Sequence, residues 1–143
     1  MTEGLVIDDN RQTADALVQM LGVLGLKVRV AYGSSAAMSV LGTGFTPQFI
    51  TLDINMPGVD GTEVLSFLRR EPRLTSVPVF VITSDDQPET RNKVMKLGAT
   101  AMIIKPATID SLEEALKRQI CLHRCLYNEI KTVEEIRRFF VVR

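Results

Sequence analysis

Hydrophobic residues along the chain follow two patterns that succeed one another five times. A short run of adjacent apolar residues comes first, and apolar residues then recur about every three to four positions until a glycine or a polar loop interrupts them. Short runs are typical of buried strands, and the longer spacing is typical of helices. The predicted strands cover residues 4–7, 27–31, 49–52, 77–82 and 101–104.

Each predicted strand leads into a segment with helical spacing. These segments lie within residues 14–24, 34–41, 60–68, 88–98 and 108–120. The expected cap is Ser34 or Ser35 for the second helix, Asp60 or Thr62 for the third, and Thr108 or Asp110 for the fifth. Pro88 falls in the first turn of the fourth helix, where its missing N–H group breaks no helical hydrogen bond.

Five strands that alternate with five helices predict an α/β domain with a parallel sheet. Such strands need cover on both faces, and right-handed βαβ crossovers place helices on both. The expected fold class is therefore a doubly wound (βα)5 three-layer sandwich. In sheets of this kind, ligands bind beyond the carboxyl ends of the strands, where the strand order reverses.

Length and composition agree with a single compact domain. The chain has 143 residues, of which 45% are hydrophobic and 24% charged, as in ordinary globular proteins. No apolar run approaches the roughly 18 residues of a membrane helix. The first ten residues, MTEGLVIDDN, are acidic rather than basic, which argues against a signal peptide. We therefore expect a cytoplasmic protein with no membrane contact.

The net charge of zero hides an uneven distribution. Residues 1–116 hold 10 Lys and Arg against 14 Asp and Glu, whereas residues 117–143 hold 7 against 3. An acidic body lacks the basic surface that nucleic acids require, so direct nucleic-acid binding is not expected. The basic tail either serves a partner or forms a solvated helix.

Polar residues with complementary chemistry stand at four of the five predicted strand ends. The first strand ends in Asp8 and Asp9, the third in Asp53, the fourth in Thr83 and the fifth in Lys105. Because the carboxyl ends of parallel strands meet at one edge of the sheet, we expect these side chains to lie together. Each has a structural explanation by itself, as a cap, a turn or a solvated charge, but the combination indicates a site.

Three carboxylates in one place repel one another, so either some stay protonated or a cation compensates them. Mg²⁺ suits an acidic pair that faces a third carboxylate. The third, Asp53, then becomes a nucleophile for phosphoryl groups, since aspartate forms aspartyl phosphates. Lys105 and Thr83 would supply a positive charge and a hydroxyl group for the phosphoryl oxygens.

The segments LVIDDN, TLDINMPGVDG, VITS and IIKPA resemble, in this order and spacing, the motif set of the receiver domain of two-component response regulators. The resemblance covers about residues 1–120, which we expect to form the receiver domain, and leaves 121–143 as a C-terminal helical extension or linker. It implies a flavodoxin-like fold with strand order 2-1-3-4-5, similar to chemotaxis regulators. It also implies a role in a phosphorelay through protein contacts, not as an enzyme.

The resemblance further assigns a role to each strand-end residue. Asp53 would accept a phosphoryl group from a sensor histidine kinase or a phosphotransfer protein, and Thr83 and Lys105 would contact that group. The implied ligands of Mg²⁺ are Asp8, Asp9, Asp53 and the main-chain carbonyl of Asn55. The Lys105–Pro106 peptide bond would be cis.

Two positions near the site are less settled. The residue three before Lys105 is usually Tyr or Phe in the family, where its ring responds to movement of the residue equivalent to Thr83, but here it is Met102. A flexible thioether fills the same space without a comparable two-position signal, so the mode of output is open. Asp85 either tunes the lifetime of the phosphoryl group, as the resemblance implies for it and Asn55, or caps the next helix.

The tail beyond residue 120 carries apolar residues near a helical period. They are Leu122, Leu126, Ile130, Val133 and Phe140. A tail that extends the last helix past the body would need a partner for this stripe, either a second copy in a homodimer or a following output domain. The equally weighted alternative is a tail that folds back over its own body.

Other functions share parts of this pattern. A Mg²⁺-dependent phosphatase of the haloacid dehalogenase type also uses a strand-end Asp, but that family has a second Asp two residues later, where this chain has Asn55. An FMN-binding flavodoxin needs a phosphate loop after the first strand, where DDNRQT would repel phosphate. The chain also fits a receiver from a larger regulator or hybrid kinase without its output domain.

Overall fold

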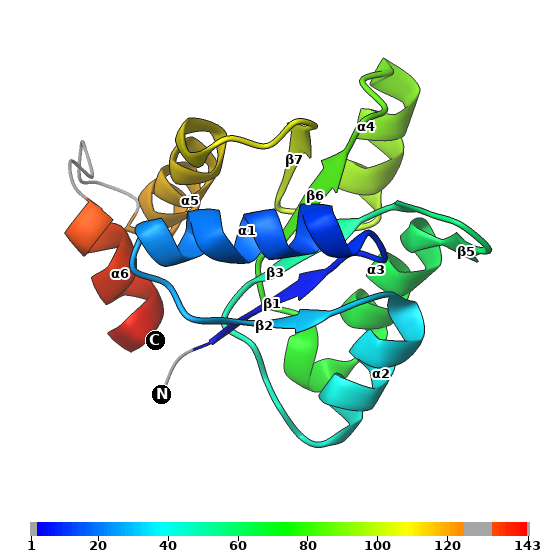
Figure 1. Ribbon diagram of the computed structural model, residues 1–143, viewed down its shortest axis with the longest axis horizontal. Coiled ribbons are helices and arrows are strands. Elements are labelled where there is room, and N and C mark those ends of the chain that lie inside the picture. Colours follow the sequence, from blue (N-terminus) through cyan, green and yellow to red (C-terminus); the bar gives the residue numbers. More distant parts are fainter. Residues whose placement is uncertain (1–2, 125–132, 143) are drawn as a thin grey trace.

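The computed structural model describes residues 3–124 and 133–142 and contains a five-stranded parallel sheet (Figure 1). The strands are β1 (Gly4–Ile7), β2 (Val28–Ala31), β3 (Ile50–Asp53), β6 (Val79–Thr83) and β7 (Ala101–Ile104). Their order is β2-β1-β3-β6-β7. Numbered along the chain without the short strands β4 and β5, this order is 2-1-3-4-5, and the predicted doubly wound fold class is confirmed.

A small antiparallel hairpin follows β3, between the predicted strand at 49–52 and the predicted helical segment within 60–68. Its strands are β4 (Asn55–Met56) and β5 (Val59–Asp60). Gly58 turns the chain between them with a φ of 73°, a conformation that glycine adopts without steric penalty. Gly61 lies so close to the main chain of Ile54 that a Cβ atom would overlap it. The hairpin is therefore drawn tightly against the start of the next helix.

Helices cover both faces of the sheet. They are α1 (Arg11–Val23), α2 (Ser34–Gly42), α3 (Gly61–Arg70), the 3-10 helix η1 (Pro72–Leu74), α4 (Pro88–Lys96), α5 (Ile109–Arg124) and α6 (Val133–Val142). One core cluster joins α2, α3 and α4 to Leu5 and Ile7, and the other joins α1, α5 and α6 to Val6. Successive strand residues point to opposite faces, which explains this division. None of the helices in the described ranges is long and apolar enough to cross a membrane.

The start of α3 follows the sequence prediction, whereas the start of α2 does not. Asp60 caps α3 by accepting a hydrogen bond from the main-chain N–H of Thr62 at 2.9 Å. The predicted cap of α2 by Ser34 or Ser35 is wrong, because Gly33 occupies the cap position and no side chain bonds there. The φ of Gly33 is 115°, which favours glycine at this turn over the expected serine.

A half-buried arginine, Arg69, holds the amino-terminal edge of the sheet together. Arg69 Nε donates to the carbonyl of Gly98 at 2.8 Å, and its Nη1 donates to the carbonyl of Val77 at 2.7 Å. Nη1 also lies within hydrogen-bond distance of the carbonyls of Leu74 and Thr75. Burial lowers the pKa of this guanidinium. Arg69 thus ties the segments that lead into β6 and β7 to the end of α3.

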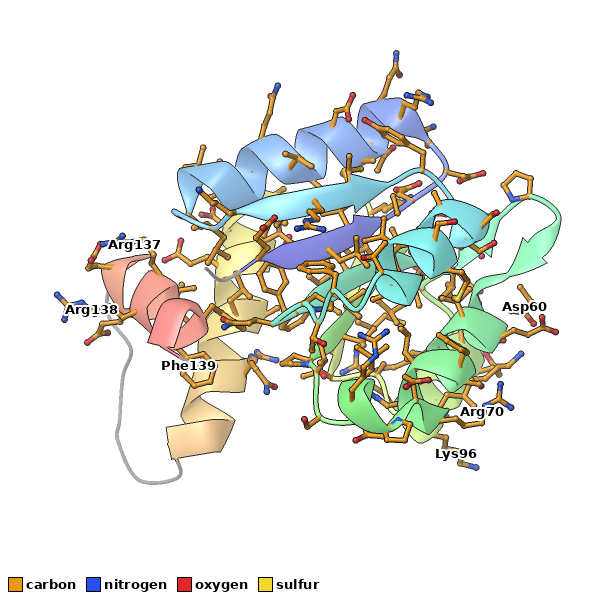
Figure 2. The ribbon with its side chains drawn as sticks, turned by 90° about the horizontal axis from the view of Figure 1, so that it is seen from below. Asp60, Arg70, Lys96, Arg137, Arg138 and Phe139 are labelled. Atoms are coloured by element: carbon orange, nitrogen blue, oxygen red, sulfur yellow. The ribbon has the colours of Figure 1, made fainter. Side chains whose placement is uncertain are left out.

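The C-terminal helix α6 folds back onto the same amino-terminal edge. Ile136 and Phe140 are fully buried, and the ring of Phe140 lies 5.1 Å from that of Phe49, the residue directly before β3. Arg137 and Arg138 lie on the outer side of the helix, away from the sheet (Figure 2). The apolar side of α6 is therefore covered by the protein's own core.

This packing decides between the two alternatives for the tail. A helix that projects past the body is the wrong prediction for residues 133–142. Helix α6 contacts α5, and its buried side chains belong to the same core cluster as those of α1 and α5. The side chains of Leu122, Leu126, Ile130 and Val133 lie outside the described residues. The homodimer through the tail, and a domain boundary at residue 120, stay predictions.

Candidate functional site

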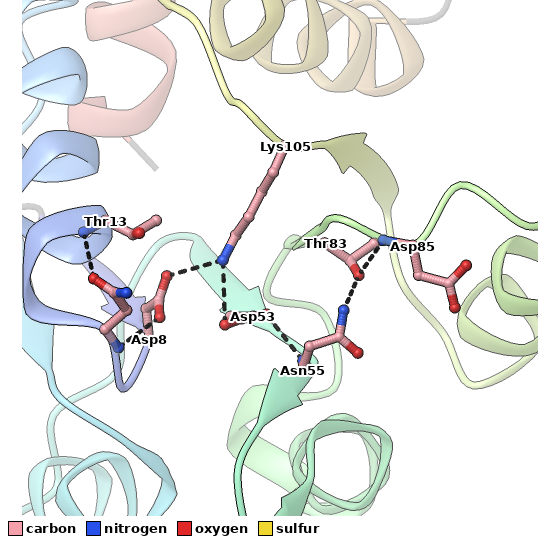
Figure 3. Close-up of polar contacts among 8 residues, drawn as sticks. Asp8, Thr13, Asp53, Asn55, Thr83, Asp85 and Lys105 are labelled. Atoms are coloured by element: carbon pink, nitrogen blue, oxygen red, sulfur yellow. Dashed lines mark hydrogen bonds and ion pairs between the residues drawn. The ribbon is translucent and has the colours of Figure 1, made fainter.

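The predicted site residues lie at the carboxyl ends of four strands of the sheet (Figure 3). Asp8 and Asp9 directly follow β1, Asp53 ends β3, Thr83 ends β6 and Lys105 follows β7. The strands β1 and β3 are neighbours, but the chain leaves β1 toward β2 and returns to β3 on the other side. The first and third strand ends therefore flank the point where the strand order reverses, which is the usual ligand position in this architecture.

Three carboxylates form the acidic part of the site. One oxygen from each of Asp8, Asp9 and Asp53 lies within 4.8 Å of the other two. Asp8 and Asp53 are buried, with exposed fractions of 0% and 4%, whereas Asp9 is exposed. Carboxylates that are this close and this buried repel one another and have lost much of their hydration. The arrangement calls for positive charge.

Lys105 supplies part of that charge. Its Nζ lies 3.3 Å from Asp53 Oδ2 and 3.5 Å from Asp8 Oδ2. Burial raises the pKa of Asp8 above its ordinary value, and the charge of Asp53 raises it further, against the lowering effects of the Asn10 N–H group and of Lys105. Lys105 thus pairs with two of the three carboxylates, and the cluster holds more acidic groups than this one lysine balances.

The donor set fits a hard divalent cation. Mg²⁺ and Ca²⁺ take oxygen ligands, and the three carboxylates converge on one point from the ends of two neighbouring strands. The raised pKa of Asp8 indicates that a cation there would relieve an unfavourable interaction. Asn55, whose main-chain carbonyl is an expected ligand, lies two residues after Asp53 in β4.

The two buried carboxylates are oriented by local turns of the same kind. Asp53 Oδ1 accepts a hydrogen bond from the main-chain N–H of Asn55 at 2.9 Å. Asp8 Oδ1 accepts one from the main-chain N–H of Asn10, also at 2.9 Å. In both cases the donor is the main-chain N–H two residues later, so a local hydrogen bond fixes one oxygen of each carboxylate. Their Oδ2 atoms face Lys105.

Thr83 lies at the centre of a chain of hydrogen bonds that leads toward α4. Its Oγ1 accepts from Asn55 Nδ2 at 2.6 Å and from the main-chain N–H of Asp85 at 3.1 Å. The carboxylate of Asp85 accepts from the N–H of Gln87 at 2.9 Å and from the hydroxyl of Thr90 at 2.5 Å. These bonds lower the pKa of Asp85. For Asp85, the geometry thus favours the helix-entry alternative.

Two further expectations concern the neighbourhood of Lys105. The Lys105–Pro106 peptide bond is cis, as the resemblance implied. Met102 is half-buried and packs against the core cluster on the α2–α4 face. It therefore fills space in β7 as an ordinary core side chain.

Sequence reasoning missed two hydrogen bonds made by asparagine side chains. Asn10 Oδ1 accepts from the N–H of Thr13 at 3.1 Å and caps α1, which its position before the apolar helical pattern could have indicated. The contact of Asn55 Nδ2 with Thr83 joins residues 28 positions apart, and no local pattern reveals a contact of that kind.

Together the sheet order and the buried aspartate at its reversal point are those of a receiver-type α/β fold. A family comparison agrees, because the model described as the response regulator receiver domain matches residues 5–117. The chain belongs to this family, which serves in two-component signalling. Aspartate phosphorylation and Mg²⁺ binding at an acidic cluster are characteristic of the family.

Known proteins similar to this chain include an uncharacterized 14.6 kDa protein in the sodA1 3′ region of Leptolyngbya boryana. It is 33% identical over 119 residues, which are 82% of this chain and 88% of the relative. The signal receiver domain of the DNA-binding response regulator merR from Colwellia psychrerythraea gives a TM-score of 0.76 at 27% identity, covering 84% of this chain and 98% of that chain.

A third similar protein is a response regulator from Burkholderia pseudomallei, whose crystal structure contains a phosphorylated aspartic acid, a calcium ion and citrate. The TM-score is 0.73 at 26% identity, and the match covers 91% of this chain and 76% of that chain. These comparisons confirm the resemblance that the sequence motifs indicated.

Proposed function

We propose that this receiver domain accepts a phosphoryl group on Asp53 from the phosphohistidine of a sensor kinase or a phosphotransfer protein in the cytoplasm. It then passes the signal on through protein contacts and is not itself an enzyme. The observation that carries the proposal is the Asp53 carboxylate, buried at the reversal point of the sheet between an acidic pair and Lys105. Family membership supports the general role.

The proposed transfer is a single displacement at phosphorus. An oxygen of Asp53 attacks the phosphoryl group, the new O–P bond forms, and the P–N bond of the phosphohistidine breaks with its electron pair passing to the imidazole nitrogen. Asp53 needs no general base, because an ionised carboxylate is already a nucleophile. Lys105 Nζ, 3.3 Å from Asp53 Oδ2, lies where it can pair with a phosphoryl oxygen. Thr83 offers its hydroxyl to another.

The residues that would hold Mg²⁺ are Asp8, Asp9, Asp53 and the main-chain carbonyl of Asn55. Bound there, the ion supplies positive charge to the phosphoryl oxygens. Support comes from the three converging carboxylates and the raised pKa of Asp8. Asp8 and Asp9 also keep the approach to Asp53 negative until a cation arrives, which makes transfer dependent on the divalent ion.

The proposal is tested by labelling with a small acyl phosphate in the presence of Mg²⁺. Intact-mass measurement should show the addition of one phosphoryl group, and peptide mapping should place it on Asp53. Asp53→Asn should abolish the label, as should removal of the divalent ion with a chelator.

A matched control comes from Asp86→Asn. Asp86 is exposed, belongs to the loop at the same edge, and lies outside the acidic cluster. This variant should be labelled like the wild type. Labelling that persists in Asp53→Asn would contradict the proposed acceptor.

A further inference from the structure

The hydroxyl of Thr83 serves as an acceptor twice. Its Oγ1 accepts from Asn55 Nδ2 at 2.6 Å and from the main-chain N–H of Asp85 at 3.1 Å, as the dashed lines in Figure 3 show. A hydroxyl oxygen has two acceptor positions and one proton to donate. Both acceptor positions are filled, and among the described residues the proton of Thr83 has no acceptor.

Both donors to Thr83 are themselves held in place. Asn55 is anchored by its own main-chain N–H, which donates to Asp53 Oδ1 at 2.9 Å. Asp85 is anchored through its carboxylate to Gln87 and Thr90 at the start of α4. Thr83 is also fully buried, with 0% of its surface exposed, so bulk water does not compete for its oxygen. The orientation of the hydroxyl is therefore set by these two neighbours.

We propose that Asn55 is a positioning residue, whose side-chain amide orients the Thr83 hydroxyl so that it donates a hydrogen bond to its next partner. Because the amide fills one acceptor position of Oγ1, the O–H group is the only function left for a partner, and a phosphoryl oxygen on Asp53 is an acceptor. Without the amide, the hydroxyl regains an acceptor position and rotates, so the donating orientation is less populated. The inference rests on the proposed function of Asp53. It concerns the side-chain amide of Asn55, not the main-chain carbonyl that is an expected ligand of Mg²⁺.

The contact itself can be tested in the ligand-free protein by NMR. The side-chain amide of Asn55 should resonate away from the range of the solvent-exposed amides, as expected for a short hydrogen bond. Thr83→Val should return it to that range, and Thr83→Ser, which keeps the hydroxyl, should not. Identical Asn55 amide signals in wild type and Thr83→Val would overturn the inference, whatever happens at Asp53.

The functional consequence is tested by a double-mutant cycle. Beryllofluoride mimics the phosphoryl group, and its Kd is measured by calorimetry at saturating Mg²⁺ in wild type, Asn55→Ala, Thr83→Val and the double variant. Asn55→Ala should raise the Kd about fivefold, the effect of losing part of one hydrogen bond. In the Thr83→Val background the same change should cost less than about twofold, because Asn55 acts through the hydroxyl.

The possible outcomes separate the two proposals. An equal loss from Asn55→Ala in both backgrounds would overturn the positioning role and leave the proposed function intact. A wild-type protein that binds no beryllofluoride would overturn the proposed function and the positioning role together. Because Asn55 is exposed, its replacement is not expected to unfold the protein, and circular dichroism checks this.

Discussion

The two edges of the central sheet are built from opposite kinds of side chain. At the carboxyl edge, three carboxylates share a small space with Lys105. At the amino-terminal edge, the rings of Phe49, Phe80 and Phe140 pack together, with centroid distances of 6.4 Å and 5.1 Å from Phe49. Burial favours the rings and disfavours the carboxylates.

Stability and chemistry are therefore located at opposite edges of the sheet in this domain. The carboxyl edge holds carboxylates that repel one another, as the proposed phosphoryl acceptor requires, so it contributes little to the free energy of unfolding or opposes it. The amino-terminal edge has no such requirement and is closed by aromatic packing and by Arg69. Substitutions at the two edges should therefore change stability in opposite directions.

The largest effect is expected for Phe140→Ala at the amino-terminal edge. Phe140 is fully buried against Phe49, so its removal leaves a cavity and should lower the free energy of unfolding by about 3–4 kcal/mol. Urea denaturation measures this. Arg138→Ala is the control on the same helix, since that side chain is 70% exposed, and should cost less than about 0.5 kcal/mol. Equal losses from both variants would mean that α6 is not part of the core.

An intermediate effect is expected for Arg69→Met. Methionine keeps the aliphatic stem but leaves the carbonyls of Gly98 and Val77 without their donor, which should cost about 2 kcal/mol. Thermal denaturation measures the change. The neighbouring Arg70 is exposed and points away from the body (Figure 2), so Arg70→Met is the matched control. A drop in Tm as large for Arg70→Met would refute the specific role of Arg69.

The smallest effect, with the opposite sign, is expected for Asp8→Asn at the carboxyl edge. The amide can still accept from the Asn10 N–H but removes one of the crowded charges, so the metal-free protein should gain about 1 kcal/mol. The same variant should lose the rise in Tm that Mg²⁺ gives the wild type. Thermal scans with and without Mg²⁺ check both. A metal-free variant less stable than wild type would show that the carboxylate is favourable there.

The carboxyl edge was predictable from the sequence because its geometry follows from topology. Parallel strands end at the same edge, so Asp8, Asp53 and Thr83 needed only correct strand assignments to be placed together. Contacts between distant segments were not predictable in this way. The spacing of apolar residues in the tail suits a projecting helix as well as one folded back, and only the packing of Phe140 on Phe49 distinguishes them.

Helix starts show the same limit on a smaller scale. Serine is a favoured cap, but the backbone before α2 takes a positive φ, and this backbone requirement outweighs the capping preference of Ser34. The side-chain contact of Asn55 with Thr83 likewise depends on the hairpin β4–β5, which was not among the predicted strands.

The packing of Phe49 also brings the two ends of the described fold together. Gly4 at the start of β1 lies so close to this ring that a Cβ atom would overlap it, and the ring of Phe140 near the end of α6 lies 5.1 Å from it. In Figure 1 the start of β1 and helix α6 lie on the same side of the molecule. A fold whose two described ends lie close together can be inserted into a surface loop of a host protein, or circularly permuted, without stretching its backbone. The proposed acceptor Asp53 lies at the opposite, carboxyl edge of the sheet, so such a graft would leave that edge free for a partner.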